Sequence, residues 1–71
     1  MMTAIEKEKK AIEIYDNHYD FINDHLNVLS TDGIVSSIYD ALDISDDDKD
    51  FDDIYYILCR YIDNYKYTLS L

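Results

Sequence analysis

The sequence predicts a small all-α protein, an antiparallel three-helix bundle with a long, a short and a long helix. Apolar residues recur three and four positions apart over most of the chain, which is the helical period. The chain has no proline and a single glycine, so few positions would interrupt a helix. Strand-like alternation is confined to residues 65–71. The length of 71 residues, without a linker-like stretch, predicts one domain over residues 1–71.

The first expected helix covers residues 3–29. A heptad seam of apolar side chains with one acidic interruption runs along it, formed by Ile5, Glu8, Ile12, Tyr15, Tyr19, Ile22, Leu26 and Leu29. A second row widens the apolar arc to nearly half the helix, and is formed by Ile14, His18, Phe21, His25 and Val28. This arc is wider than one neighbouring helix needs, so we expect dimerisation through the apolar face of the first helix.

The second expected helix is short and follows a turn at residues 30–33. Ser30, Thr31 or Asp32 can cap it, and Gly33 offers free backbone angles in the turn. Its apolar face is formed by Ile34, Val35, Ile38, Ala41 and Leu42. A short amphipathic helix of this kind can bury one side against both long helices.

The third expected helix begins after Ser45, where a run of aspartates is favoured by the positive end of the helix dipole. Its inner face is formed by Phe51, Ile54, Tyr55, Leu58, Tyr61, Ile62 and Tyr65. We expect the helix to reach about residue 67. Residues 65–71 either complete this helix or fold back over the bundle.

The charge and the cysteine content limit the possible partners. Sixteen acids against six bases give a formal charge of −10, which disfavours direct binding to nucleic acid or to an anionic membrane surface. No window approaches the roughly 20 apolar residues of a membrane span, and no amino-terminal signal pattern is present. Cys59 is the single cysteine and cannot form an internal disulfide, which favours a reducing compartment. We therefore expect a cytoplasmic protein.

Catalytic motifs are missing from the sequence. Cys59 lacks the flanking residues of a known nucleophile, and no glycine-rich loop could hold a phosphate group. Carboxylates in exposed rows rarely hold the shifted pKa that acid–base catalysis needs. These observations predict a protein that is not an enzyme and has no cofactor.

Two patterns resemble metal ligands only in part. Asp46, Asp48 and Asp50 have the spacing of the first three calcium ligands of an EF-hand, but Phe51 and Ile57 replace its required glycine and glutamate. His18 and His25 are two helical turns apart, which is too far to chelate one metal ion by themselves. Each histidine is better explained as a partly buried helix residue that makes one hydrogen bond, and we expect no metal site.

The acidic residues are the strongest functional signal. Asp16, Asp20 and Asp24 recur every four residues, which places them about 6 Å apart along one side of a helix. A second cluster stands at the start of the third expected helix and consists of Asp46, Asp47, Asp48, Asp50, Asp52 and Asp53. After Lys10 only three bases follow, so these acids are poorly compensated. A face that only keeps the protein soluble is the simpler explanation of these rows.

Tyr56 and Tyr67 fall on the outer side of the third expected helix, among charged residues. Exposed tyrosines give a large contact area at a low cost in side-chain entropy. We therefore expect Tyr56 to contact a partner together with the two groups of acids.

These observations predict a small acidic protein that inhibits or masks a basic, nucleic-acid-binding partner, as DNA-mimic inhibitors of phages and mobile elements do. One four-residue row carries one charge per ~6 Å, whereas duplex DNA carries one per ~1.7 Å of its axis, so several rows or two copies must act together. Three alternatives remain open: a toxin-neutralising immunity protein, a small regulatory interaction module, and a purely structural homodimer.

Overall fold

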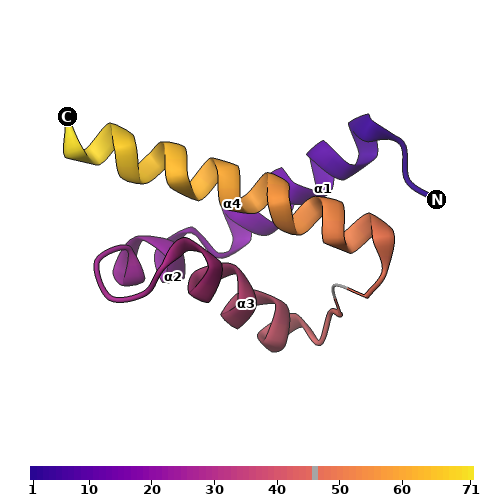
Figure 1. Ribbon diagram of the computed structural model, residues 1–71, viewed down its shortest axis with the longest axis horizontal. Helices are drawn as coiled ribbons and strands as arrows, with labels where there is room; N and C mark the ends of the chain where they lie inside the picture. The colour runs from indigo at the N-terminus through magenta and orange to yellow at the C-terminus, as the bar shows by residue number, and fades with distance from the viewer. Residues whose placement is uncertain (46) are drawn as a thin grey trace.

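The computed structural model describes residues 1–45 and 47–71, and this part of the chain forms four α-helices without a β-strand. The helices are α1 (Ala4–Asn17), α2 (Tyr19–His25), α3 (Thr31–Leu42) and α4 (Lys49–Ser70). α1 and α3 pack against α4, and α2 lies near the carboxyl-terminal half of α4 (Figure 1). The predicted all-α class is confirmed. The predicted count of three helices is wrong, because the first expected helix is divided in two.

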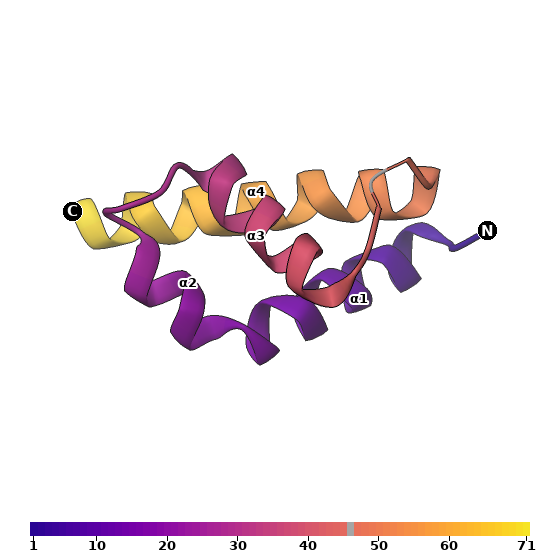
Figure 2. The same ribbon diagram turned by 90° about the horizontal axis from the view of Figure 1, so that it is seen from below.

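The division falls at His18, whose φ of −118° and ψ of 19° leave the helical region. The carbonyl oxygen of Ile14 accepts the backbone N–H of His18 at 3.1 Å and also its ring Nδ1–H at 2.9 Å. The backbone and the side chain of His18 thus share one carbonyl oxygen of α1. Beyond His18, α2 turns away from α1, and the two helices form a V (Figure 2).

α3 begins at one of the three cap residues that the sequence offered and ends at a left-handed residue that the sequence did not indicate. The Oγ of Ser30 caps the helix by accepting the backbone N–H of Gly33 at 3.1 Å. Gly33 lies in the first turn of α3 and has no positive φ, so the predicted turn conformation at this glycine is wrong. Instead Asp43 adopts the left-handed conformation, with φ 55° and ψ 44°, and ends the helix.

α4 is the longest helix and begins at the cap residue Asp48, whose carboxylate accepts the backbone N–H groups of Asp50 at 2.8 Å and Phe51 at 3.4 Å. Because the helix continues to Ser70, residues 65–70 complete α4 rather than fold back over the bundle. No helix in the described segments, 1–45 and 47–71, is long and apolar enough to cross a membrane.

All four helices contribute to one hydrophobic core. α4 supplies Ile54, Leu58 and Ile62, which recur every four residues and are fully buried. The other buried residues come from the remaining helices and the turn after α2, and are Ala11, Ile14, Ile22, Leu26, Ile34, Val35, Ile38 and Tyr39. Among the described residues no charged side chain is buried, so the charges lie at the surface, where a partner can reach them.

Candidate interaction surfaces

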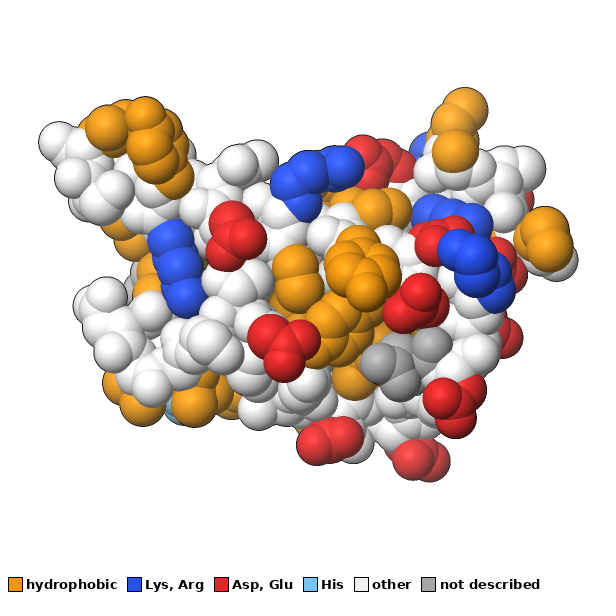
Figure 3. Space-filling view, viewed as in Figure 1, with side chains coloured by type: hydrophobic (Ala, Val, Ile, Leu, Met, Phe, Trp, Pro, Cys, Tyr) orange, Lys and Arg blue, Asp and Glu red, His pale blue; other side chains and the backbone are white. Residues whose placement is uncertain are grey.

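Charge is unevenly distributed along the chain. Residues 11–48 contain ten acids and no lysine or arginine, so this segment carries the whole net charge of −10. It forms the end of α1, both short helices and the loops that join them. The face drawn in Figure 3 accordingly shows acidic side chains, and no lysine or arginine, along its lower part. The α2–α3 side of the molecule is therefore the more acidic side.

The predicted row of Asp16, Asp20 and Asp24 is interrupted. All three side chains are exposed, and none forms an ion pair within the described part of the chain. Asp16 belongs to α1, however, whereas Asp20 and Asp24 belong to α2 beyond the break at His18. The spacing of about 6 Å along one helix therefore applies to Asp20 and Asp24 alone.

The aspartates at the start of α4 have several different environments. Asp46 lies outside the described residues, whereas Asp47 is exposed and Asp48 caps the helix. Asp50 accepts the backbone N–H of Met2 at 3.0 Å. Asp52 is half-buried on α4.

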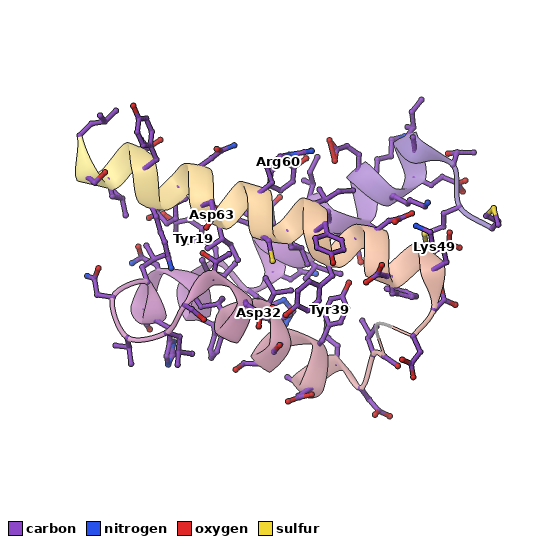
Figure 4. The ribbon with its side chains drawn as sticks, in the orientation of Figure 1. Tyr19, Asp32, Tyr39, Lys49, Arg60 and Asp63 are labelled. Atoms are coloured by element: carbon purple, nitrogen blue, oxygen red, sulfur yellow. The ribbon has the colours of Figure 1, made fainter. Side chains whose placement is uncertain are left out.

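Two of these aspartates are neutralised by lysines. Lys7 of α1 lies 3.7 Å from the carboxylate of Asp50 and also pairs with Asp53. Lys49, which lies at the start of α4 (Figure 4), pairs with Asp53 as well. Hydrogen bonds from Lys49 and Lys7 hold the pKa of Asp53 below its ordinary value. These two aspartates therefore join α1 to α4 and contribute little uncompensated charge.

A different acidic surface lies where α3 meets α4. We call it the acidic face and define it by Asp32, Asp40, Asp52, Tyr56, Cys59 and Asp63. Its α4 members are spaced four, three and four residues apart, which places them on one side of the helix. Sequence reasoning included Asp52 and Tyr56 in the partner surface but missed the other four residues.

Hydrogen bonds between α3 and α4 hold this face together. The Tyr55 hydroxyl bonds to the carboxylate of Asp32, accepts or donates to Ser36 at 2.8 Å, and lines a hollow together with Asp40. Thr31 donates a hydrogen bond to Asp63, so Asp32 and Asp63 lie on adjoining parts of α3 and α4 (Figure 4). No lysine or arginine in the described chain forms an ion pair with an acid of this face.

The carboxylates of this face affect the ionisation of two neighbouring side chains. Burial, followed by the nearby charges of Asp32 and Asp63, raises the pKa of the Cys59 thiol to about 11. Burial and the hydrogen bond to Asp32 likewise raise the pKa of Tyr55 to about 12. A reactive cysteine needs a lowered pKa, so the surroundings of Cys59 disfavour a role as nucleophile.

Tyr56 provides an apolar centre for the acidic face. Its side chain is 68% exposed, and its ring meets that of Tyr55 edge to face with centroids 6.3 Å apart. An exposed aromatic ring supported by a second ring and surrounded by polar groups is the composition of a protein interface. Tyr67 is similarly exposed but lies near the far end of α4.

The two histidines are structural residues, as the sequence indicated. Both are half-buried, and the ring Nδ1 of His25 donates to the carbonyl oxygen of Phe21 at 2.8 Å, just as His18 donates to Ile14. Within residues 1–45 and 47–71, no group of three histidine, cysteine or acidic side chains could hold a metal ion. The acidic face therefore remains the surface with the clearest chemistry.

No protein-family model, curated protein or solved structure matches this chain. The function proposed below therefore rests on the chemistry of the surfaces themselves.

Proposed function

We propose that this protein binds a basic partner protein through its acidic face and thereby masks the partner's nucleic-acid-binding surface. The observation that carries the proposal is the placement of Asp32, Asp52 and Asp63 on the α3–α4 surface that also carries the exposed ring of Tyr56, with no paired base among residues 1–45 and 47–71. Neighbouring like charges destabilise a lone chain slightly, and a partner that supplies lysines and arginines removes this cost. Such a partner meets nucleic acid in the cytoplasm, where we place this protein.

The density of charge fits one nucleic-acid strand better than a duplex. Averaged over the 37 Å length of the body, the net charge of −10 that residues 11–48 carry would amount to one excess charge per ~4 Å, against ~3.4 Å for a single strand and ~1.7 Å for a duplex. One copy can thus replace a strand in a basic groove. A dimer through the α1 face presents two such surfaces.

Tyr56 adds a second resemblance to a single strand. Proteins that hold single strands combine a basic groove for the phosphates with side chains that stack on the bases. The acidic face offers carboxylates in the place of phosphates and the ring of Tyr56 in the place of a base. DNA-mimic inhibitors of phages and mobile elements likewise occupy the basic nucleic-acid channel of their targets.

Affinity capture with the immobilised full chain tests the proposal. Partners should be retained from the native host lysate at low salt, and either high salt or an added single-stranded DNA should release them. The variant Asp32→Asn/Asp52→Asn/Asp63→Asn should lose the partner while circular dichroism shows an intact fold. As a matched control, Asp16→Asn/Asp20→Asn/Asp24→Asn removes the same charge from elsewhere and should retain it. Retention that is insensitive to salt, to DNA and to the first variant would overturn the proposal.

A neutralising or regulatory interaction module is the second candidate, and the exposure of Tyr56 and Tyr67 favours it. In that case aromatic contact rather than charge holds the partner. Tyr56→Ala should then abolish capture, while the triple asparagine variant of the acidic face should still bind. Loss of capture by the triple asparagine variant supports the masking function instead.

A further inference from the structure

An open groove of about 620 Å³ runs between α1 and α4, and three of the six bases, Lys7, Lys9 and Arg60, line it. Its floor is apolar and comes from Ile5, Ile12 and Ile57, of which the first two are 69% and 46% exposed. Its edges carry Glu8, Lys9 and Arg60. Large exposed isoleucines beside one another mark a surface that another apolar surface covers.

We infer that a second copy of this chain occupies the groove, with its α1 antiparallel to the first α1 around a two-fold axis between Glu8 and Lys9. A homodimer of this kind is independent of the proposed masking function and forms from the pure protein. It also leaves the acidic face uncovered, because Asp32 and Asp63 lie toward α3 whereas Arg60 lies on the opposite edge of α4 (Figure 4).

The register of this pairing follows from the positions of Ile5, Glu8, Lys9 and Ile12 along α1. In an antiparallel pair related by a two-fold axis, residues at equal distances on either side of the axis face each other. The midpoint between Ile5 and Ile12 is also the midpoint between Glu8 and Lys9. One axis therefore brings Ile5 against Ile12 of the second copy and Lys9 against Glu8 of the second copy.

The charges around the groove favour this occupant. Lys9 is exposed and has no carboxylate partner among the described residues, whereas Glu8 already lies 3.3 Å from Arg60. In the dimer, Lys9 of one copy lies beside Glu8 of the other copy. Each Glu8 then lies between Arg60 of its own copy and Lys9 of the second copy. Two copies that met through residues 11–48 would instead oppose ten acids to ten acids.

A stable contact would extend beyond the groove to the neighbouring surfaces of α1 and α4. A standard interface takes about 800 Å² from each partner, which is roughly a sixth of the 4717 Å² that this chain exposes. A chain of this length has a small core and often depends on a partner subunit for stability. Burial of Ile5 and Ile12 extends the core across the two copies.

Sedimentation equilibrium of the full chain over a range of micromolar concentrations tests the dimer. We expect a dimer. Ile12→Glu buries a charge in the interface and Lys9→Glu places it opposite Glu8 of the second copy, so each variant should raise the dissociation constant at least about tenfold. Val28→Glu is the matched control, because Val28 is also apolar and 73% exposed but lies outside the groove, and it should change nothing. Circular dichroism checks that the variants fold.

Cross-linking tests the register. In a Cys59→Ser background, Lys9→Cys places a thiol beside the axis, so a short bismaleimide should join the two copies. Asp16→Cys lies roughly 11 Å from the axis along α1, and therefore about 22 Å from its counterpart, so it should not react across the dimer. A monomer at every concentration, a dimer unaffected by Ile12→Glu, or equal cross-linking at both positions would overturn the inference.

Discussion

The hydroxyl oxygens of Tyr19 and Tyr65 lie 2.8 Å apart, and the centroids of their rings are 5.8 Å apart. The Tyr65 hydroxyl also donates to Oδ1 of Asn23 at 2.7 Å. The hydrogen bond to Tyr19, followed by desolvation, raises the pKa of Tyr65 to about 12. This pair attaches α2 to α4 beyond the break at His18, where α2 no longer continues α1.

Tyr65→Phe should therefore lower the thermal unfolding midpoint by several degrees, because it removes two hydrogen bonds while it keeps the ring. Tyr67→Phe is the matched control, since Tyr67 stands two residues along the same helix and is 66% exposed. Differential scanning calorimetry measures both midpoints. Equal effects of the two variants would show that the hydroxyl of Tyr65 does not hold α2.

Asp43→Gly should stabilise the protein by about 0.5–1 kcal/mol, because a left-handed residue with a Cβ is strained and glycine relieves that strain. Asp43 is the one residue other than glycine with a positive φ in the described chain. Asp43→Ala keeps the Cβ, removes the same charge and should not stabilise, so the pair separates backbone strain from charge. Urea denaturation at neutral pH gives both free energies of unfolding.

The free energy of unfolding should fall in acid, and the ion pairs of Asp53 should contribute to this fall. The pKa of Asp53 is lowered in the folded chain, so the unfolded chain takes up the proton at a higher pH. The stabilisation that Asp53 contributes is present at pH values above its ordinary pKa of ~3.9, and it is lost as the pH falls through the pKa of Asp53 in the folded chain. The hydrogen bonds from Thr3 lower the pKa of Glu6 with the same sign.

Asp53→Asn should make the urea midpoint less dependent on pH in this acid range, whereas Asp47→Asn, on an exposed residue of the preceding loop, should change it less. The stabilisation contributed by Lys7, the ion-pair partner of Asp53, has the opposite dependence on pH and is lost at high pH. Its pKa is raised, chiefly by the hydrogen bond to Asp53, so its stabilisation is present below ~10.4 and is lost as the pH rises through the folded value. An identical acid profile for Asp53→Asn and the unchanged chain would contradict this account.

Cys59 should react slowly with iodoacetamide. Raising its pKa from 9.0 to about 11 leaves about 100-fold less thiolate at pH 8 than in the unfolded chain. Urea should therefore accelerate alkylation by about this factor or more, since the folded side chain is also half-buried. Asp63→Asn removes one of the charges that raise the pKa and should speed the reaction of the folded protein modestly. Equal rates with and without urea would contradict the pKa assignment.

The apolar period predicted α3, α4 and most of their inner faces, because a helix repeats its contacts every three or four residues whatever it packs against. The break in the first expected helix was not predictable in this way. No proline or glycine marks it, and the conformation of His18 accompanies the packing of Tyr19 against Tyr65 far along the chain. The faces of α1 were misjudged for the same reason: Ile12 of the seam is 46% exposed, while Ile14 beside it is buried.

The candidate site was predictable only within single helices. The outward position of Tyr56 followed from the spacing in α4, and the structure confirms its exposure. That Asp32 and Asp63 adjoin depends on how α3 lies against α4, and that Asp53 pairs with Lys7 as well as with nearby Lys49 depends on a residue 46 positions away. Pairing across such sequence distances is a property of the folded chain, which no local pattern records.

The concentration of all net charge in residues 11–48 makes the molecule an electric dipole as well as an anion. A basic surface attracts the acidic side and repels the lysines of α1, so it exerts a torque on the chain before the two touch. Collisions are then biased toward the correct orientation, which raises the association rate more than it strengthens the final contact. For the basic partner proposed above, the arrangement of charge would thus set how quickly the partner is found, and moderate salt should slow this search before it releases the bound partner.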